Sequence, residues 1–333
     1  MNAKILCLRA LALLIVLCIS CQPATAIPSP SATASPSPTP PYTTTNCPPG
    51  DHTETLTSGG QVRRYRLHVP LTYQPEKPVA LVLGFHGAGS NSEQFETYSQ
   101  FSNVADQEGF LVAYPQALGQ HPYWNTARGS SNPDLQFVRD LIDDLESRCN
   151  IDPNQVYASG HSNGGGMANR LACDLADRIA AIGTVSGAYQ GSEDCSPSRP
   201  VAVFAMHDTD DPVVPYNGFQ NTGQPPAAYF LIGIPIPQWA SAWATRNDCN
   251  ANPSEVVHTV LISEKRWSDC RAGADVILYS IQGGGHGWPS DLIDVPQLFW
   301  DFFVDHPLGN SPLSSSQTRP LYTRSDCLLP MNT

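Results

Sequence analysis

The sequence is poor in charged residues, and the charge that it carries is mostly negative. Only 14% of its 333 residues are charged, and 18 lysines and arginines face 30 aspartates and glutamates, which gives a formal charge of −12. A surface of this sign repels phosphate backbones and anionic headgroups, so we expect no nucleic-acid partner. Hydrophobic residues make up 41% of the chain, which is enough for one large core and excludes a disordered protein.

Long hydrophobic runs are also missing. The apolar run from Ala10 to Ile19 is far shorter than the roughly 20 residues that a membrane-spanning helix needs, which excludes a multi-span membrane protein. The run follows the basic residues Lys4 and Arg9. This pattern is typical of a secretory signal peptide, which we place at residues 1–26.

Two cleavage sites compete in this segment. The Ala-Thr-Ala triplet at 24–26 fits an A-x-A site and predicts a soluble secreted protein. The Ile-Ser-Cys triplet that ends at Cys21 instead resembles the end of a bacterial lipoprotein signal, although Cys18 stands where such signals usually carry leucine. In that alternative, a lipid anchor at Cys21 is the only contact with a membrane. Both alternatives predict export, so we expect an extracellular protein or one tethered to the outer cell surface.

Beyond the signal, the spacings C-x-x-C and H-x-x-x-H that mark many zinc sites do not occur, so we expect no metal and no cofactor. Export makes disulfide bonds the expected state of the remaining cysteines. Their number is odd, which leaves at least one free or intermolecular thiol. Cys249 and Cys270 bracket a hairpin pattern and are the first pair that we expect, whereas the other pairings stay open. The seven cysteines are Cys47, Cys149, Cys173, Cys195, Cys249, Cys270 and Cys327.

Internal repeats and clear domain boundaries are missing as well. From 27 to 45, 15 of 19 residues are Pro, Ser or Thr, which have nothing to bury, so we expect an extended linker over 27–46. One folded domain follows over 47–306. The segment 307–333 is rich in Ser and Pro and is expected to be a C-terminal tail.

Short apolar runs alternate with helical patterns through the folded domain. Runs that are apolar on both faces and separated by helices are typical of a mainly parallel sheet covered on both sides, so we expect a single-domain α/β fold. The expected strands are Val62–Val69, Val79–Phe85, Phe110–Tyr114, Val156–Ser159, Ile179–Val185, Val201–Ala205 and Val276–Ile281. The helical patterns cover 93–108, 134–148, 164–175, 237–246 and 293–304.

A Gly-His-Ser-Asn-Gly motif at 160–164 is the clearest chemical signal in the sequence. It lies between an expected strand and an expected helix, which is the context that a nucleophilic serine on a sharp turn requires. Gly160 and Gly164 supply the small neighbours of such a turn. The N-terminus of the following helix points its amides at the place where negative charge develops. Ser162 is therefore the candidate nucleophile.

A nucleophilic serine needs a base and an acid that orients the base, in the chain order Ser, Asp or Glu, His. Three aspartates follow the expected strand 201–205. We prefer Asp211, because a Pro-Val-Val-Pro run behind it favours a rigid turn, and we expect Asp208 and Asp210 to cap the loop. The candidate base is His286, which follows the last expected strand and is flanked by glycines.

Backbone amides are the expected partners of a developing oxyanion. The glycine-rich turn after the strand 79–85 places an amide of Gly87 or Ala88 there, and sequence alone does not choose between them. The amide of Asn163 is the second candidate. We expect His86 to hydrogen-bond the turn and His161 to shape the pocket. No chemical role is expected for either histidine.

Aromatic side chains are expected near the same rim, where their faces suit sugar rings, ferulate-like aromatics or polyester chains. The candidates for substrate binding are Phe85, Trp124, Tyr216 and Trp288.

Taken together, these motifs resemble the polyhydroxybutyrate depolymerase-type esterases, which are close to the bacterial feruloyl and acetyl-xylan esterases of carbohydrate esterase family 1. The resemblance extends over about 50–305 and rests on five segments, at 84–89, 151–165, 170–173, 207–216 and 283–289. It implies an α/β-hydrolase fold. It also implies an esterase in which Ser162, Asp211 and His286 form the catalytic triad.

Three residues depart from the pattern of that family. Asp208 stands where glycine is usual, His161 where methionine is common, and Gly287 where threonine is common. The triad is intact, so the departures concern the shape of the pocket. Secreted depolymerases of this type usually carry a separate polymer-binding module, and none is recognisable here. We therefore favour soluble oligomers or esterified plant polysaccharide over crystalline polyester.

The sequence thus predicts a secreted serine esterase that acts on carboxylic esters through an acyl-enzyme. Two alternatives remain open, namely a serine peptidase on the same fold and a non-catalytic binding protein on a hydrolase scaffold. Fold does not fix the substrate, so hydroxybutyrate oligomers, feruloyl esters and acetylated sugars all remain candidates.

Overall fold

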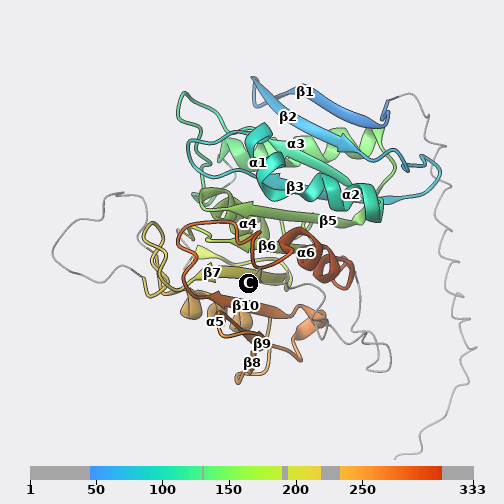
Figure 1. Ribbon diagram of the computed structural model, residues 1–333. Coiled ribbons are helices and arrows are strands. Elements are labelled where there is room, and N and C mark those ends of the chain that lie inside the picture. The colour runs from blue at the N-terminus through green and yellow to red at the C-terminus, as the bar shows by residue number, and fades with distance from the viewer. Residues whose placement is uncertain (1–45, 130, 190–193, 219–232, 310–333) are drawn as a thin grey trace, which may run out of the picture. The chain divides into compact units, whose positions relative to one another are not determined.

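The computed structural model of the protein describes residues 46–129, 131–189, 194–218 and 233–309 (Figure 1). The predicted signal peptide with Cys21, nearly all of the predicted linker over 27–46, and the predicted tail beyond Gly309 lie outside the described residues. None of the helices in the described ranges combines the length and the apolar character that crossing a membrane requires.

Within the described ranges, ten strands form one sheet in the order β1-β2-β4-β3-β5-β6-β7-β10-β9-β8 (Figure 1). The six strands from β4 to β10 in this order run parallel, whereas two strands at each edge pair antiparallel. The strands are β1 (Gly50–Ser58), β2 (Gln61–Val69), β3 (Val79–Phe85), β4 (Leu111–Pro115), β5 (Ile151–His161), β6 (Ala181–Val185), β7 (Ala202–Asp208), β8 (Ser254–Val257), β9 (Ile262–Trp267) and β10 (Val276–Ile281).

Helices cover both faces of this sheet. On one face lie α1 (Ser92–Ser99), α2 (Phe101–Glu108) and α6 (Val295–Val304). On the other lie α3 (Pro133–Arg148), α4 (Asn163–Asp174) and α5 (Ile236–Arg246). The sheet therefore separates two hydrophobic cores, and the expected α/β class is confirmed.

The central strands are apolar on both sides because each side faces one of these cores. In β3, Leu81 and Leu83 pack into the core under α3 and α4, whereas Val82 between them packs into the core under α1 and α2. Successive side chains of a strand point to opposite faces, so only a nearly continuous apolar run satisfies both cores. This is why the inner strands were recognisable in the sequence.

Two features of the fold differ from the sequence-based expectation. The single helix expected over 93–108 is two helices, because Gln100 adopts a left-handed conformation with φ of 61° that ends α1 and begins α2. The edge strand β1 was not predicted, and β8 and β9 were anticipated only as a hairpin pattern between Cys249 and Cys270. Every residue of β8 is exposed, and β1 alternates exposed with partly buried residues up to Ser58, so neither presents a buried apolar run.

Three disulfide bonds cross-link the described part of the chain. They join Cys47 to Cys149, Cys173 to Cys195, and Cys249 to Cys270. The last pair brackets the hairpin of β8 and β9, which confirms the one pairing that the sequence predicted. Cys327 lies outside the described residues.

The bond between Cys47 and Cys149 closes a loop of 102 residues, whereas the bond between Cys249 and Cys270 closes 21. A longer loop loses more entropy on cross-linking, so the chain-entropy relation gives about 5 kcal/mol for the first bond and about 3 kcal/mol for the second. We therefore expect Cys47→Ser/Cys149→Ser to lower the free energy of unfolding more than Cys249→Ser/Cys270→Ser does. Urea unfolding of both double variants measures this order, and a larger loss in the second variant would contradict it.

Candidate active site

The carboxyl ends of β5, β7 and β10 lie at one edge of the sheet, because these strands run parallel within it. In open α/β sheets this edge is where functional groups gather. Ser162 follows β5, Asp211 follows β7, and His286 follows β10. The structure therefore brings together three candidates that are separated by up to 124 residues in the sequence.

Ser162 occupies a strained turn between β5 and α4. Its φ of 55° and ψ of −122° lie in a region that residues other than glycine rarely adopt. Its amide donates to the carbonyl of Val185, and its carbonyl accepts from the amides of Gly166 and Ala188. Three backbone hydrogen bonds thus hold this residue in the turn, with its side chain turned away from capping α4.

The turn also requires glycine at two positions, because the backbone leaves no room there for a Cβ atom. A Cβ atom on Gly160 would lie 2.4 Å from the carbonyl of Gly164, and one on Gly164 would lie 2.1 Å from the carbonyl oxygen of Phe85. Real Cβ atoms do not approach other atoms so closely. The second contact brings the start of α4 directly against the end of β3.

Hydrogen bonds link the three candidates in series. Nε2 of His286 lies 2.9 Å from Oγ of Ser162, and Nδ1 of His286 lies 2.7 Å from Oδ2 of Asp211. Because the carboxylate accepts a hydrogen bond from Nδ1–H, the proton of the neutral ring stays on Nδ1 and Nε2 is left free to accept the serine proton. This geometry can transfer a proton from the hydroxyl group to the imidazole.

The carboxylate of Asp211 is buried but accepts several hydrogen bonds. Its Oδ1 accepts from the amides of Val213 and Val214, each at 2.8 Å, and its Oδ2 also lies 3.3 Å from Nε2 of His207. Burial alone would raise the pKa of Asp211. The hydrogen bonds from His207, His286 and the Val214 amide outweigh burial, so the pKa lies well below its usual value.

The loop after β7 differs in one respect from the expectation. Its amides at Val213 and Val214 are capped by Asp211 itself, so the prediction that Asp208 and Asp210 cap the loop is wrong. The side chain of Asp208 lies instead under the loop that carries His286. It leaves no room for a Cβ at Gly284, whose amide donates to it.

Burial is the main reason why the pKa of Asp208 rises to about 6. The neighbouring carboxylates of Asp211 and Asp210 act in the same direction, whereas His207 and the amide of Gly284 oppose them. The titration of Asp208 therefore falls close to neutral pH, beside a carboxylate that stays ionised.

The two histidines expected to have structural roles lie beside Ser162. Burial, together with the nearby His286, lowers the pKa of His161 to about 3, so this ring is neutral at neutral pH. Its centroid lies 4.9 Å from that of His286. The ring of His86 is buried, donates from Nδ1 to the carbonyl of Gly87, and accepts at Nε2 from the amide of Ala117.

A pocket of about 380 Å³ opens over Ser162. Gly87, Ala88, His161 and His286 contribute to its wall. The amides of Gly89 and Ser90 are engaged by backbone carbonyls, whereas those of Gly87 and Ala88 have no backbone partner within the described ranges. The first amide of α4, at Asn163, has no acceptor inside its own helix. The predicted donors thus flank the serine.

The aromatic residues expected to bind substrate lie deeper than the sequence indicated. Phe85 and Trp124 are fully buried, with their ring centroids 5.2 Å apart, so they offer a substrate no surface and that prediction is wrong. Trp288 is 5% exposed and packs edge-on against Phe95. Tyr216 is partly buried and its hydroxyl group lies 2.6 Å from that of Ser280. The burial of these aromatic side chains depends on long-range packing, which the sequence does not show.

Ser90, Gln94 and Tyr98 line the pocket and were missed from the sequence. They lie on or just before α1, at intervals of four residues. This spacing places them on one helical face. Nothing in the sequence distinguishes that face from an ordinary solvated one.

One cluster with metal-ligand side chains occurs in the described part of the chain, away from Ser162. It consists of Asp51, His68 and Glu96. Both ring nitrogens of His68 are already paired, with Asp51 at 2.7 Å and Asp106 at 3.2 Å, and Glu96 is paired with Arg66. We interpret the cluster as a set of hydrogen bonds around His68 beside the Arg66–Glu96 ion pair.

Comparison with known proteins places this geometry in a family. A family model described as esterase PHB depolymerase matches residues 64–218. NocK of Nocardia uniformis subsp. tsuyamanensis, whose name describes it as an esterase, is 30% identical over 266 residues, which cover 73% of this chain and 76% of that protein. Feruloyl esterase B of Piromyces equi is 29% identical over 256 residues, which are 72% of this chain but only 44% of the longer relative.

A solved structure supports the fold. The acetyl xylan esterase from Aspergillus awamori superposes with a TM-score of 0.58 over 76% of this chain and 99% of that one, at 15% sequence identity. The expected α/β-hydrolase fold is therefore confirmed. The chain belongs to the PHB depolymerase family of carboxylic esterases.

Proposed function

We propose that the protein is an exported serine esterase that forms an acyl-enzyme on Ser162. The observation that carries the proposal is the series of two hydrogen bonds, 2.9 Å from serine to His286 and 2.7 Å from His286 to Asp211. Such a series lets a neutral imidazole accept the serine proton as the oxygen attacks the ester carbonyl. Asp211 holds the imidazole in the required tautomer and stabilises its protonated form.

The attack places a negative charge on the former carbonyl oxygen. The amide of Asn163 and an amide of Gly87 or Ala88 are the proposed donors to this oxygen. They are fixed in place before the reaction, so they need not reorganise as the charge develops. His286 then gives its proton to the leaving alcohol. A water molecule, deprotonated by the same histidine, then attacks the acyl carbon. The bond from this carbon to Oγ of Ser162 breaks, the histidine returns its proton to Oγ, and the acid leaves.

The proposed substrates are feruloyl or acetyl esters of a polysaccharide. Relatives are named feruloyl esterase B and, in Emericella nidulans, feruloyl esterase C. A second hollow of about 820 Å³ shares Gln94 and Tyr98 with the pocket over Ser162. Most of its other wall is polar, with Glu93 and Asp291 among its residues. A polar wall suits the hydroxyl groups of sugars better than a polyester chain.

We also propose that a signal over 1–26 exports the folded domain of 47–306. Three disulfide bonds support this, because they persist in oxidising compartments. Acylation at Cys21 remains the proposed alternative to free secretion. Labelling of cells with a fatty-acid analogue separates the two, since only the lipoprotein incorporates the label at Cys21.

Replacement of the nucleophile tests the mechanism. We expect Ser162→Ala to lower kcat by at least about 10⁴-fold, because the remaining groups only bind the substrate and the oxyanion. A fluorophosphonate should label the wild-type protein at Ser162 and leave the variant unlabelled. Hydrolysis by the variant at the wild-type rate would exclude Ser162 as the nucleophile.

A panel of substrates tests the proposed specificity. Hydrolysis of a feruloylated xylo-oligosaccharide, an acetylated xylo-oligosaccharide and a hydroxybutyrate oligomer is measured with the same enzyme preparation. We expect the highest kcat/KM for one of the two sugar-linked esters, because of the polar wall. A higher value for the hydroxybutyrate oligomer would overturn the substrate assignment and leave the serine mechanism intact.

The raised pKa of Asp208 predicts a pH effect on stability. The folded pKa of about 6 lies above the ordinary value of 3.8, so the stabilisation is complete below about pH 4 and is lost as the pH rises through 6. Asp208→Asn cannot ionise. We therefore expect its free energy of unfolding to rise relative to wild type by about 2 kcal/mol between pH 4 and pH 7.5.

Urea unfolding at several pH values measures this difference. Asp210→Asn is the matched control, because Asp210 is an exposed carboxylate two residues away. Asp210 makes a smaller contribution to the raised pKa of Asp208 than burial does, so the control should keep most of the wild-type pH dependence. Parallel curves for wild type and Asp208→Asn would show that Asp208 does not titrate in this range.

A further inference from the structure

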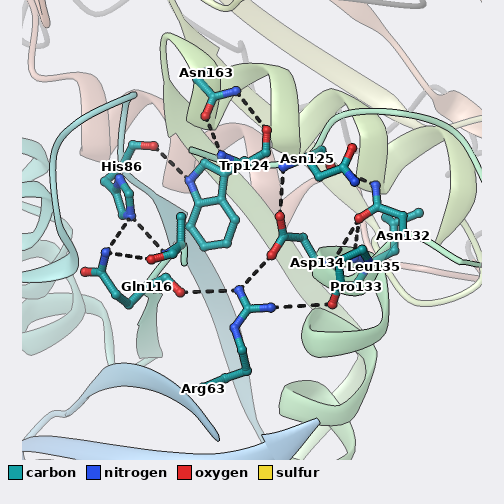
Figure 2. Close-up of polar contacts among 11 residues, drawn as sticks. Arg63, His86, Gln116, Trp124, Asn125, Asn132, Pro133, Asp134, Leu135 and Asn163 are labelled. Carbon is teal, nitrogen blue, oxygen red and sulfur yellow. Dashed lines mark hydrogen bonds and ion pairs between the residues drawn. The ribbon is translucent and has the colours of Figure 1, made fainter. Parts of the chain in front are cut away.

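Trp124 lies beside His86 and Asn163 (Figure 2). It is fully buried. Its indole Nε1–H donates to the carbonyl of His86 at 2.9 Å, its amide donates to Oδ1 of Asn163 at 2.7 Å, and Nδ2 of Asn163 donates to its carbonyl at 3.2 Å. One residue is thus bonded to the glycine-rich turn after β3 and to the first residue of α4.

The glycine-rich turn is held at both ends by the same short segment. The carbonyl of His86, at the start of the turn, accepts from the Trp124 indole, and the amide of Gly89, at its end, donates to the carbonyl of Pro122 at 2.8 Å. Gly87 and Ala88 lie between these two bonds. Their amides therefore take their position from residues 122–124.

This segment is itself anchored by a buried ion pair. The amide of Asn125 donates to Oδ2 of Asp134 at 2.8 Å, and Oδ1 of Asp134 accepts from Arg63 at 2.7 Å (Figure 2). The side chains of the pair are 1% and 6% exposed. Breaking one partner of such a pair leaves an uncompensated buried charge, so the anchor resists displacement.

We propose that Trp124 is a positioning residue that fixes the distance between the two proposed oxyanion donors. The inference rests on the proposed function, in which the amides of Asn163 and of Gly87 or Ala88 bind the oxyanion. Each donor belongs to a different element of the fold. Trp124 is bonded to both elements, through its indole on one side and its backbone on the other.

The oxyanion makes strict demands on this distance. Donors act when they lie about 2.7–3.1 Å from the oxygen of the tetrahedral intermediate, and a shift of about 1 Å in a reacting group can cost about 10²-fold in rate. The planar ground-state ester places its oxygen elsewhere, so the same shift affects substrate binding less. Loss of Trp124's bonds should therefore lower kcat and leave KM nearly unchanged.

The test compares two Trp→Phe variants, each of which loses one buried indole N–H donor. Trp124→Phe removes the indole donor to His86, whereas the control Trp243→Phe removes a buried indole donor to Asn169, at 3.0 Å on α4. Both tryptophans are fully buried. The readouts are melting temperature, KM, and kcat per active site, where the sites are titrated to completion with a fluorophosphonate.

We expect similar losses of melting temperature in the two variants, but a fall in kcat per titrated site of about 10-fold or more only in Trp124→Phe. The inhibition constant of a phenylboronic acid, which forms a tetrahedral adduct with the serine, should rise by a similar factor in this variant. A purely structural role would affect both variants alike. Wild-type kcat per site in Trp124→Phe overturns the inference.

A second pair decides the question if Trp124→Phe does not fold. Asn163→Ala keeps the backbone amide but removes both side-chain hydrogen bonds to Trp124. The control is Asn169→Ala in the same helix, α4, which removes the acceptor of the indoles of Trp239 and Trp243. Only the first should lower kcat per site. Equal kcat per site in the two asparagine variants overturns the inference.

Failure of the proposed function has a different signature. In that case the wild-type protein itself shows no hydrolysis that depends on Ser162, and no fluorophosphonate label. That result overturns the inference together with the function on which it rests.

Discussion

The backbone of Ser162 is the constraint on which the site depends. A residue with a side chain is held at φ of 55°, a conformation that costs about 1–3 kcal/mol and persists only where the surroundings over-determine it. The surroundings here are the bonds to Val185, Gly166 and Ala188 and the close approach of Gly164 to β3. That approach brings the end of β3 against the start of α4, so the strained residue lies where these two elements meet.

The charges of the side chains around Ser162 are set by burial and hydrogen bonding. A buried carboxylate is costly unless it is hydrogen-bonded, and Asp211 meets this condition with donors from two amides and two imidazoles. The environment shifts the pKa values of three neighbouring side chains in different ways. Asp211 stays ionised, His161 stays neutral, and Asp208 titrates near pH 6. His286 is the histidine that contacts both Asp211 and Ser162, at 2.7 and 2.9 Å.

Local signals made much of the fold and site predictable, and long-range packing explains what they missed. Glycines at fixed positions made the turn around Ser162 and the loop of His286 recognisable in the sequence. Apolar runs made the inner strands recognisable. The substrate role expected for Trp124 was wrong because its burial depends on His86 and Asn163, 38 and 39 residues away. The break at Gln100 was missed because glutamine, unlike glycine, does not indicate a left-handed backbone conformation within a helical pattern.

The structure separates the residues of the proposed reaction from other residues that line the same pocket. Ser162 and the turn after β3 are fixed by buried bonds, whereas Gln94 and Tyr98 lie exposed on α1. This helix has only eight residues, from the cap at Asn91 to the break at Gln100. Changes on its outer face reach the pocket without touching either core. In this chain, substitutions on the outer face of α1 would therefore change the wall of the pocket and leave the strained turn at Ser162 and its backbone hydrogen bonds in place.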